Sequence, residues 1–356
     1  MLSTSDFRPD WASPPGDTIR NIMNERGMTE TYLSDHIQCS PEDLQNLLQG
    51  RMAITISLAR KLTHALGASV EFWMSRDFQY REDAARLAAA DPDWLASLPL
   101  NEMIANRWLG RPPTAADEMQ ACLKFFDVPN LAAWRERYGN LSRHAAFRTS
   151  ASFESNPAAV AAWIRQGERQ AASITCVPWN PMKMRGALDE IRALTHQKDP
   201  ERFLPRLQQL CANCGVAVVT VKAPTGCRAS GAVRFLSEEK ALIQLSFRYL
   251  SDDHFWFTFF HEVGHLLLHK FDRLLLEWIQ GEVTDQEREA NEFSANVLVP
   301  EAARQALFRL RANAREVIRF AVRIGIAPGI VVGQLQHFGI IGREQLNGLK
   351  RRYKWR

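Results

Sequence analysis

Residues 255–269 read FWFTFFHEVGHLLLH, an apolar run that is interrupted by His261, Glu262 and His265. At 3.6 residues per turn the two histidines stack on one face of a helix, where both imidazoles can reach one metal ion. In this H-E-x-x-H pattern, typical of zinc hydrolases, two neutral imidazoles hold Zn²⁺ and the carboxylate serves as general base. The alternative is that these polar residues lie on the solvated face of a helix. The apolar residues on either side of them argue against it. Burying these groups without a partner would cost several kcal/mol.

A catalytic zinc ion needs a third protein ligand and one open coordination position. The best candidates lie in residues 284–300, TDQEREANEFSANVLVP, which show helical apolar spacing. Glu287 and Asn291 share one polar stripe of this helix, so Glu287 is the first candidate. Glu289 lies on another stripe and is the second. His269 is displaced along the axis of the first helix, and we expect it to support the ligands or the helix end rather than bind the metal.

Length and composition favour a cytoplasmic protein with two or three domains. The chain has 356 residues, of which 46% are hydrophobic and 24% charged, as in ordinary soluble proteins. No window approaches about 18 uncharged apolar residues, and the N-terminal residues lack the basic and apolar regions of a signal peptide. The six scattered cysteines are then expected to be reduced thiols. We expect no membrane association.

Charge is distributed unevenly along the chain. Residues 1–80 hold 7 Lys and Arg against 10 Asp and Glu, whereas residues 301–356 hold 12 against 3. The basic part could face nucleic acid or an acidic partner, and it could equally be a set of solvated helix faces. Its last residues, KRRYKWR, are expected to form a solvated tail.

Residues 15–80 show five helical segments, and a short helix, a tight turn and a second short helix among them form a helix-turn-helix pattern. The segment resembles the XRE (Cro/repressor-type) domain of HigA-like antitoxins and regulators, most specifically in ITISLARKLTHALGASVEFW, residues 54–73. The resemblance implies that residues 40–49 form a recognition helix. The expected DNA contacts are Ser40, Gln45, Asn46, Gln49 and Arg51.

DNA binding by this domain alone should be weak, because Glu42 and Asp43 would face a groove lined with phosphates and the domain is acidic. Glutamine and asparagine can nevertheless form paired hydrogen bonds to adenine. The alternative is a helix-turn-helix that contacts protein instead of DNA.

The rest of the chain predicts a mainly α fold with an α+β section. Residues 81–181 are expected to form a helical connector, and residues 301–356 a basic helical part with helix-turn-helix-like spacing. Residues 182–300 are expected to form a zincin-like domain, with a small antiparallel sheet of three strands at 216–222, 230–236 and 241–247. The strand that starts at Ser230 and Gly231 could offer a free edge to a substrate segment, or be an ordinary sheet edge.

Residues 182–342 resemble the ImmA/IrrE family of metallopeptidases. The likeness rests on residues 230–269, on EREANEFSANVLVP, and on RFAVRIGIAPGIVVGQLQHFGIIG near the C-terminus. It implies that His261, His265 and Glu287 bind zinc and that Glu262 is the general base. Members of this family cleave XRE-type repressors.

Together these patterns predict a cytoplasmic transcriptional regulator that carries a zinc metalloendopeptidase, in a stress, phage or toxin–antitoxin circuit. The expected partners are double-stranded operator DNA, a repressor as protein substrate, a toxin, and a second copy of the chain. One alternative is a non-enzymatic HigA-like antitoxin or autorepressor, in which the zinc fold is a sensor or scaffold. Another is an N-terminal domain that docks the substrate and never touches DNA.

Overall fold

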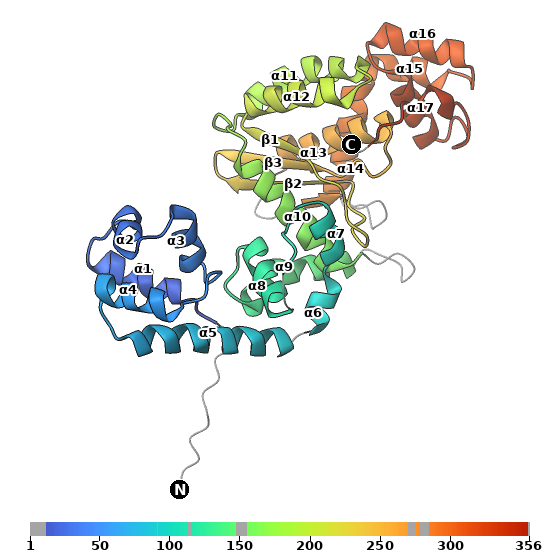
Figure 1. Cartoon of the computed structure of the whole chain (residues 1–356). Coiled ribbons are helices and arrows are strands. Elements are labelled where there is room, and N and C mark those ends of the chain that lie inside the picture. Colours follow the sequence, from blue (N-terminus) through green and yellow to red (C-terminus); the bar gives the residue numbers. More distant parts are fainter. Residues whose placement is uncertain are drawn as a thin grey trace. The chain divides into compact units, whose positions relative to one another are not determined.

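The computed structural model describes most of the chain. The contacts between residues divide it into two compact units, Met1–Gly139 and Asn140–Arg356 (Figure 1). Among the described helices, none combines the length and apolar character that a membrane crossing requires. The described residues are 12–90, 92–112, 115–146, 155–269, 275–277 and 285–354.

The N-terminal unit begins with five helices packed around a shared apolar core. The core includes Ile19, Leu33, Leu44 and Trp73, all buried. Side chains of Thr29, Ser40 and Thr55 cap the second, third and fourth helices by accepting backbone N–H groups, as N-cap residues do. The five helices are α1 (Pro15–Glu25), α2 (Glu30–Ile37), α3 (Pro41–Leu48), α4 (Ile56–Leu66) and α5 (Val70–Ala90).

Four further helices follow α5 along the chain. An aromatic cluster of Trp94, Phe126, Trp134 and Tyr138 holds three of them together, with ring centroids 5.2–6.3 Å apart. The helices are α6 (Pro92–Ser97), α7 (Leu100–Ala105), α8 (Ala115–Phe126) and α9 (Leu131–Ala146).

The C-terminal unit is a four-stranded mixed sheet covered by helices on both faces. Strand order is β1-β3-β2-β4, with β1 parallel to β3, and with β2 antiparallel to both β3 and β4. The strands are β1 (Val216–Thr220), β2 (Gly231–Ser237), β3 (Lys240–Leu245) and β4 (Leu275–Glu277). The prediction of an antiparallel sheet was therefore wrong for β1. Alternation along a strand indicates which face is buried, but not which strand lies beside it.

The expected free edge on β2 is also absent where it was predicted. Within the described residues, β4 pairs with the start of β2, and Gly231 lies opposite Glu277. Because β4 occupies that position, a substrate segment cannot add directly to this part of β2.

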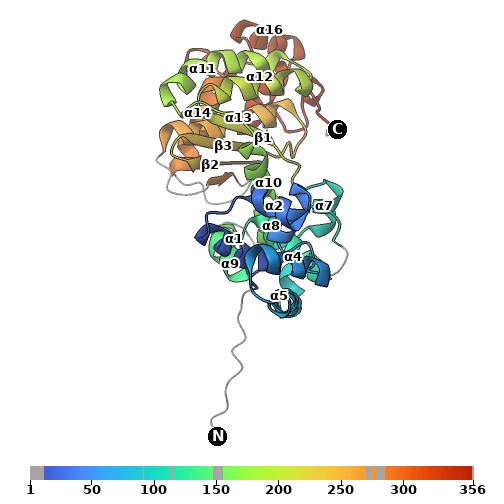
Figure 2. The same ribbon diagram turned by 60° about the vertical axis from the view of Figure 1, so that its left-hand side comes forward.

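Helix α10 (Pro157–Ala172), which the sequence groups with the connector, covers one face of the sheet. Its Trp163 donates the indole N–H to the carbonyl of Val221 at 2.8 Å, and Gln244 of β3 donates to the carbonyl of Trp163 at 2.7 Å. The opposite face carries α11 (Pro181–Ala193), α12 (Pro200–Ala212) and α13 (Asp252–Leu268) (Figure 2).

The main core lies between α13 and the strands, where Trp256, Phe259 and Ile243 are fully buried. Of the later α-helices, α14 (Asp285–Leu298) and α17 (Pro328–His337) pack against α13, and α15 (Glu301–Phe308) and α16 (Ala314–Ile324) pack against α17. Helix α17 packs against α13, and a side chain at Gly329 would collide with the carboxylate of Asp252. This basic part therefore packs on the core with its α17 helix buried.

Residues 350–354 do not form the solvated tail that was predicted for residues 350–356; residues 355–356 lie outside the described residues. Tyr353 is buried, Arg352 forms a β-bridge with Ser251, and the Arg351 N–H donates to Asp252 at 3.0 Å. The Arg351 guanidinium also donates to the carbonyl of Thr195 at 2.8 Å. The basic side chains of this segment led to the prediction of a solvated tail. Its N–H groups instead donate to backbone carbonyls and to Asp252.

Candidate metal centre

Helix α13 is buried on nearly all sides. Its large apolar side chains, such as Trp256 and Phe260, enter the core, so the polar residues from His261 onward lie in a largely water-free environment. His261 and His265 are each 1% exposed, and Glu262 is fully buried. Polar groups buried to this extent need partners, which limits what can surround them.

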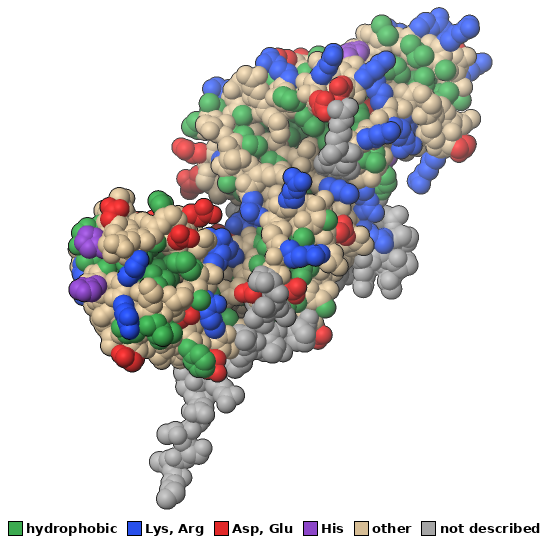
Figure 3. Space-filling view, in the orientation of Figure 1, with side chains coloured by type: hydrophobic (Ala, Val, Ile, Leu, Met, Phe, Trp, Pro, Cys, Tyr) green, Lys and Arg blue, Asp and Glu red, His purple; other side chains and the backbone are tan. Residues whose placement is uncertain are grey.

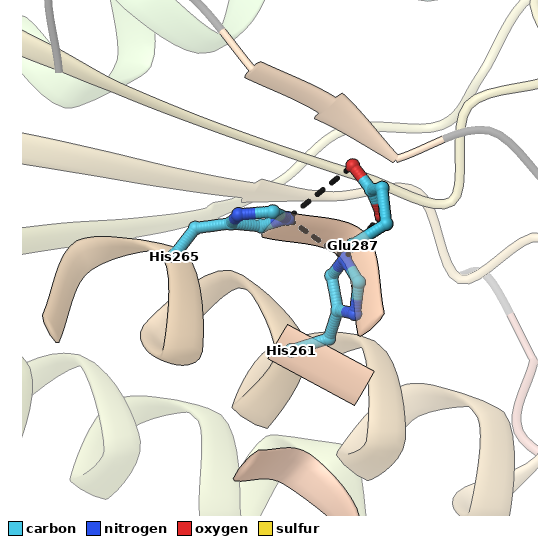
Figure 4. A group of neighbouring side chains, drawn as sticks. All are labelled: His261, His265 and Glu287. Carbon is cyan, nitrogen blue, oxygen red and sulfur yellow. Dashed lines mark hydrogen bonds and ion pairs between the residues drawn. The ribbon is translucent and has the colours of Figure 1, made fainter. Parts of the chain in front are cut away.

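Helix α14 places Glu287 against the two histidines. Its Oε2 atom lies 3.2 Å from Nε2 of His261, and its Oε1 atom lies 3.5 Å from Nε2 of His265. The two Nε2 atoms are 3.0 Å apart, so all three side chains point to one spot between the helices (Figure 4). Ser294 supports this approach by donating its hydroxyl to the carbonyl of Phe257 at 2.9 Å.

These three side chains are a group that could hold a metal ion, since their ligand atoms all lie within 4.8 Å of one another. Zinc binds nitrogen and oxygen ligands at about 2.0–2.1 Å in tetrahedral geometry, which separates neighbouring ligand atoms by about 3.3 Å. The observed separations of 3.0, 3.2 and 3.5 Å bracket that value. Two imidazoles and one carboxylate therefore fit zinc in both chemistry and spacing.

The protonation states also suit a metal. Burial lowers the pKa of His265, so its imidazole stays neutral and keeps a lone pair. Burial alone would raise the pKa of Glu287, but hydrogen bonds and charge interactions with His261 and His265 bring it well below its usual range. Without a metal ion, these hydrogen bonds to Glu287 need a proton on Nε2; a bound cation would take the place of that proton, leaving an anionic carboxylate beside neutral imidazoles.

His261 and His265 are each also held in orientation by a contact at Nδ1, the ring nitrogen that faces away from Glu287. Nδ1 of His261 lies 3.0 Å from Oδ1 of Asn291, an acceptor, so that nitrogen carries the proton and Nε2 keeps its lone pair. Nδ1 of His265 lies 3.0 Å from Nδ1 of His269, whose Nε2 lies 2.9 Å from Oε2 of Glu289. Glu289, the second ligand candidate, thus binds His269 and not the histidine pair.

Glu262 lies directly beneath the first residue of β2. A Cβ atom at Gly231 would stand 2.3 Å from its Oε1 atom and 2.7 Å from Cγ2 of Thr258. Only a residue without a side chain leaves room for the carboxylate there. The sequence singled out Gly231 only as part of a sheet edge, because nothing in a local pattern shows that a strand will cross over the helix.

The predicted DNA contacts lie on or beside α3. Ser40 caps that helix, accepting from the Asp43 N–H at 3.0 Å, and Arg51 is exposed. Gln45 donates to Glu30 of α2 at 2.6 Å, and Gln49 accepts from Lys124 of α8. Asn46 is half-buried, and its carbonyl accepts the Arg51 N–H at 2.8 Å. The two glutamines would have to exchange these partners before contacting a base.

The positive charge of the C-terminal part gathers on α15, α16 and the loop between them. Figure 3 shows Lys and Arg side chains over the region where Figure 1 draws α15 and α16. The exposed arginines there are Arg309, Arg311, Arg315, Arg319 and Arg323.

Residues 216–335 match the family model of the peptidase M78 family, described as the IrrE N-terminal-like domain. The match runs from β1 to α17 and contains the complete histidine–glutamate group. No curated protein matches the chain.

Proposed function

We propose that the C-terminal unit is a zinc-dependent metalloendopeptidase. The observation that carries the proposal is the convergence of His261, His265 and Glu287 on one spot, with Glu262 beside it on the same helix. The match to a peptidase family over residues 216–335 supports it. In this proposal His261, His265 and Glu287 hold Zn²⁺.

The reaction is the hydrolysis of a peptide bond. Zinc, when bound in such a site, acidifies water to about neutral pKa and polarises the scissile carbonyl. Glu262 accepts a proton from the attacking water and passes it to the amide nitrogen as the C–N bond breaks. Asn291 and His269 hold the two imidazoles in orientation while this occurs.

Purified full-length protein, loaded with zinc and mixed with random synthetic peptides, tests the proposal. We expect about one zinc ion per chain and cleavage that falls about 100-fold or more in Glu262→Gln. Glu292→Gln removes an exposed carboxylate from α14 and serves as the matched control. Absence of bound zinc, or equal cleavage by Glu262→Gln, would remove the enzymatic proposal.

For the N-terminal unit we propose sequence-specific binding of double-stranded DNA through α3, with a second copy of the chain on the symmetric half-site. The support is the short α2–turn–α3 arrangement, with Arg51 exposed just after α3. We further propose that the peptidase acts on a repressor-type protein, in a stress, phage or toxin–antitoxin circuit.

DNA from upstream of the protein's own gene is the probe for this part. We expect binding that weakens steeply with salt, and that weakens further in Arg51→Ala while protein folding is retained. Binding without cleavage of any protein would favour the non-enzymatic autorepressor. Cleavage of a repressor without DNA binding would favour an N-terminal unit that docks the substrate.

A further inference from the structure

Helix α13 has a surface within one turn of the first proposed metal ligand. From Phe255 to Leu266, every residue of this helix is buried except Phe257, which is half-buried. Phe257 lies one helical turn before His261, about 6 Å along the axis and on the same side of the helix. Its ring centroid is 6.4 Å from that of the His261 ring. A chain that approaches the metal centre along α13 from this end therefore meets Phe257 first.

From Phe257 a row of aromatic rings continues over α17 and α15, two helices that pack together. The ring of His337, the last residue of α17, lies 6.1 Å from that of Phe257, and the ring of Phe338 lies 5.3 Å from that of His337. Phe308, the last residue of α15, packs edge-to-face on Phe338 at 5.2 Å. We call Phe257, His337, Phe338 and Phe308 the aromatic strip.

The outer part of the aromatic strip is exposed to solvent. Phe308 is 47% exposed and Phe338 41%, and His337 is exposed as well. Single exposed apolar residues are common on protein surfaces, but these rings touch one another and lead to a buried polar site. Contiguous exposed aromatic side chains are a feature of surfaces that bind another chain. The aromatic strip therefore has the character of a binding surface.

The end of α17 holds the middle of the strip in place. Gly339 has a φ of 69°, and the N–H of Ile340 donates to the carbonyl of Leu335 at 2.9 Å, as at a helix end closed by glycine. Leu335 is buried, so this turn is fixed to the core. Because the turn is closed, His337 and Phe338 are kept at the surface. A surface that is ordered in advance loses little conformational entropy when it binds a peptide.

The spacing of the rings suits an extended peptide. Side chains on one face of an extended chain repeat about every 6.6 Å, two residues apart. Neighbouring rings of the strip lie 5.2–6.4 Å apart, so alternate side chains of one peptide can each contact a ring. Arg309 and Arg311, both exposed, follow Phe308 along the chain and would repel cationic residues at that end. A segment with alternating apolar residues and few cations is therefore the ligand that fits.

We propose that the aromatic strip binds the extended part of a protein substrate on one side of the scissile bond. The inference rests on the proposed peptidase activity, and it adds that substrates are selected several residues away from the bond that is cleaved. The substrate class is an extended segment in which apolar side chains alternate along the chain. Contacts at the strip speed cleavage because binding energy from remote residues helps to orient the reacting bond.

Peptides of two lengths test the proposal on the zinc-loaded full chain. A sequence cleaved in the random peptides is made as a short peptide of about four residues, and as two longer ones extended on one side or the other by alternating leucine and serine. We expect one extension to raise kcat/KM at least tenfold over the short peptide, and the same extension with lysine in place of leucine to give no gain.

The double variant Phe308→Ala with Phe338→Ala should abolish the gain from the extension and leave cleavage of the short peptide unchanged. Phe78→Ala removes a phenylalanine that is 63% exposed on α5 of the N-terminal unit, and it should keep the gain. The strip is overturned if neither extension helps, if the double variant keeps the gain, or if it slows the short peptide equally.

Peptide binding separates this inference from the proposed function. The probe is a fluorescent peptide of about ten residues with alternating leucine and serine, and its binding to Glu262→Gln is followed by anisotropy. If the wild-type chain cleaves nothing, yet Glu262→Gln binds this probe at least tenfold more tightly than its lysine counterpart and loses that preference with Phe308→Ala and Phe338→Ala, the strip stands and the peptidase does not. Absence of both cleavage and selective binding overturns both.

Discussion

Asp252, at the start of α13, should make the C-terminal unit less stable as the pH rises. Its Oδ2 atom is buried without a hydrogen-bond partner among the described residues, and burial raises the pKa of this carboxyl from 3.8 to about 6. The folded state therefore favours the protonated form. At 1.36 kcal/mol per pKa unit, about 3 kcal/mol of stability is present below pH 3.8 and is lost as the pH rises through about 6.

Asp252→Asn removes this dependence, because its amide oxygen still accepts the N–H groups of Arg351 and Asp253. We expect the free energy of unfolding of the variant to exceed that of the wild type by about 3 kcal/mol more at pH 7 than at pH 3.8. Urea titration of the full chain, with hydrogen exchange of α13 identifying the relevant transition, measures the difference.

Asp253→Asn is the matched control, and the opposite result is expected for it. Asp253 pairs with Lys350 at 2.6 Å, and both side chains are less than one tenth exposed. Leaving Lys350 without its anionic partner, with only the Gln336 amide oxygen to accept at 2.7 Å, should destabilise the C-terminal unit by about 3–5 kcal/mol at neutral pH. A difference between wild type and Asp252→Asn that is constant with pH, or that shrinks as the pH rises, would refute the reasoning.

Three further outcomes follow from the metal centre. His269→Ala removes the ring behind His265 and should weaken zinc binding about 10–100-fold in competition with a chelator; unchanged affinity would contradict the supporting role. Gly231→Ala places a methyl group against Glu262 and should slow peptide cleavage on the order of 100-fold with zinc content retained. Free zinc at about 100 times its Kd should add about 2.7 kcal/mol of unfolding free energy, and no change on chelation would argue against a site.

The sequence was most informative where function and local geometry coincide. A spacing of four residues puts His261 and His265 on one helix face, and the same helical arithmetic separated Glu287 from Glu289. The structure brings Glu287 to the histidines and Glu289 to His269. The sequence could indicate which side chains share a helix face because side-chain direction along a helix repeats regularly.

Contacts between distant segments were beyond the sequence. The parallel pairing of β1 with β3 depends on which strands meet, and strand patterns carry no such information. The burial of Tyr353 was hidden by the surrounding Lys and Arg residues, whose guanidinium and ammonium groups find carbonyls and carboxylates on distant segments.

The division of the ligands between α13 and α14 has a consequence for chain entropy. An ion held by His265 and Glu287 would close a loop of about 20 residues, as a disulfide does, and such closure removes about 3 kcal/mol of freedom from the unfolded chain. Unlike a disulfide, this cross-link would open whenever the ion leaves. The availability of the metal would then determine both peptide hydrolysis and the stability of the packing between α13 and α14.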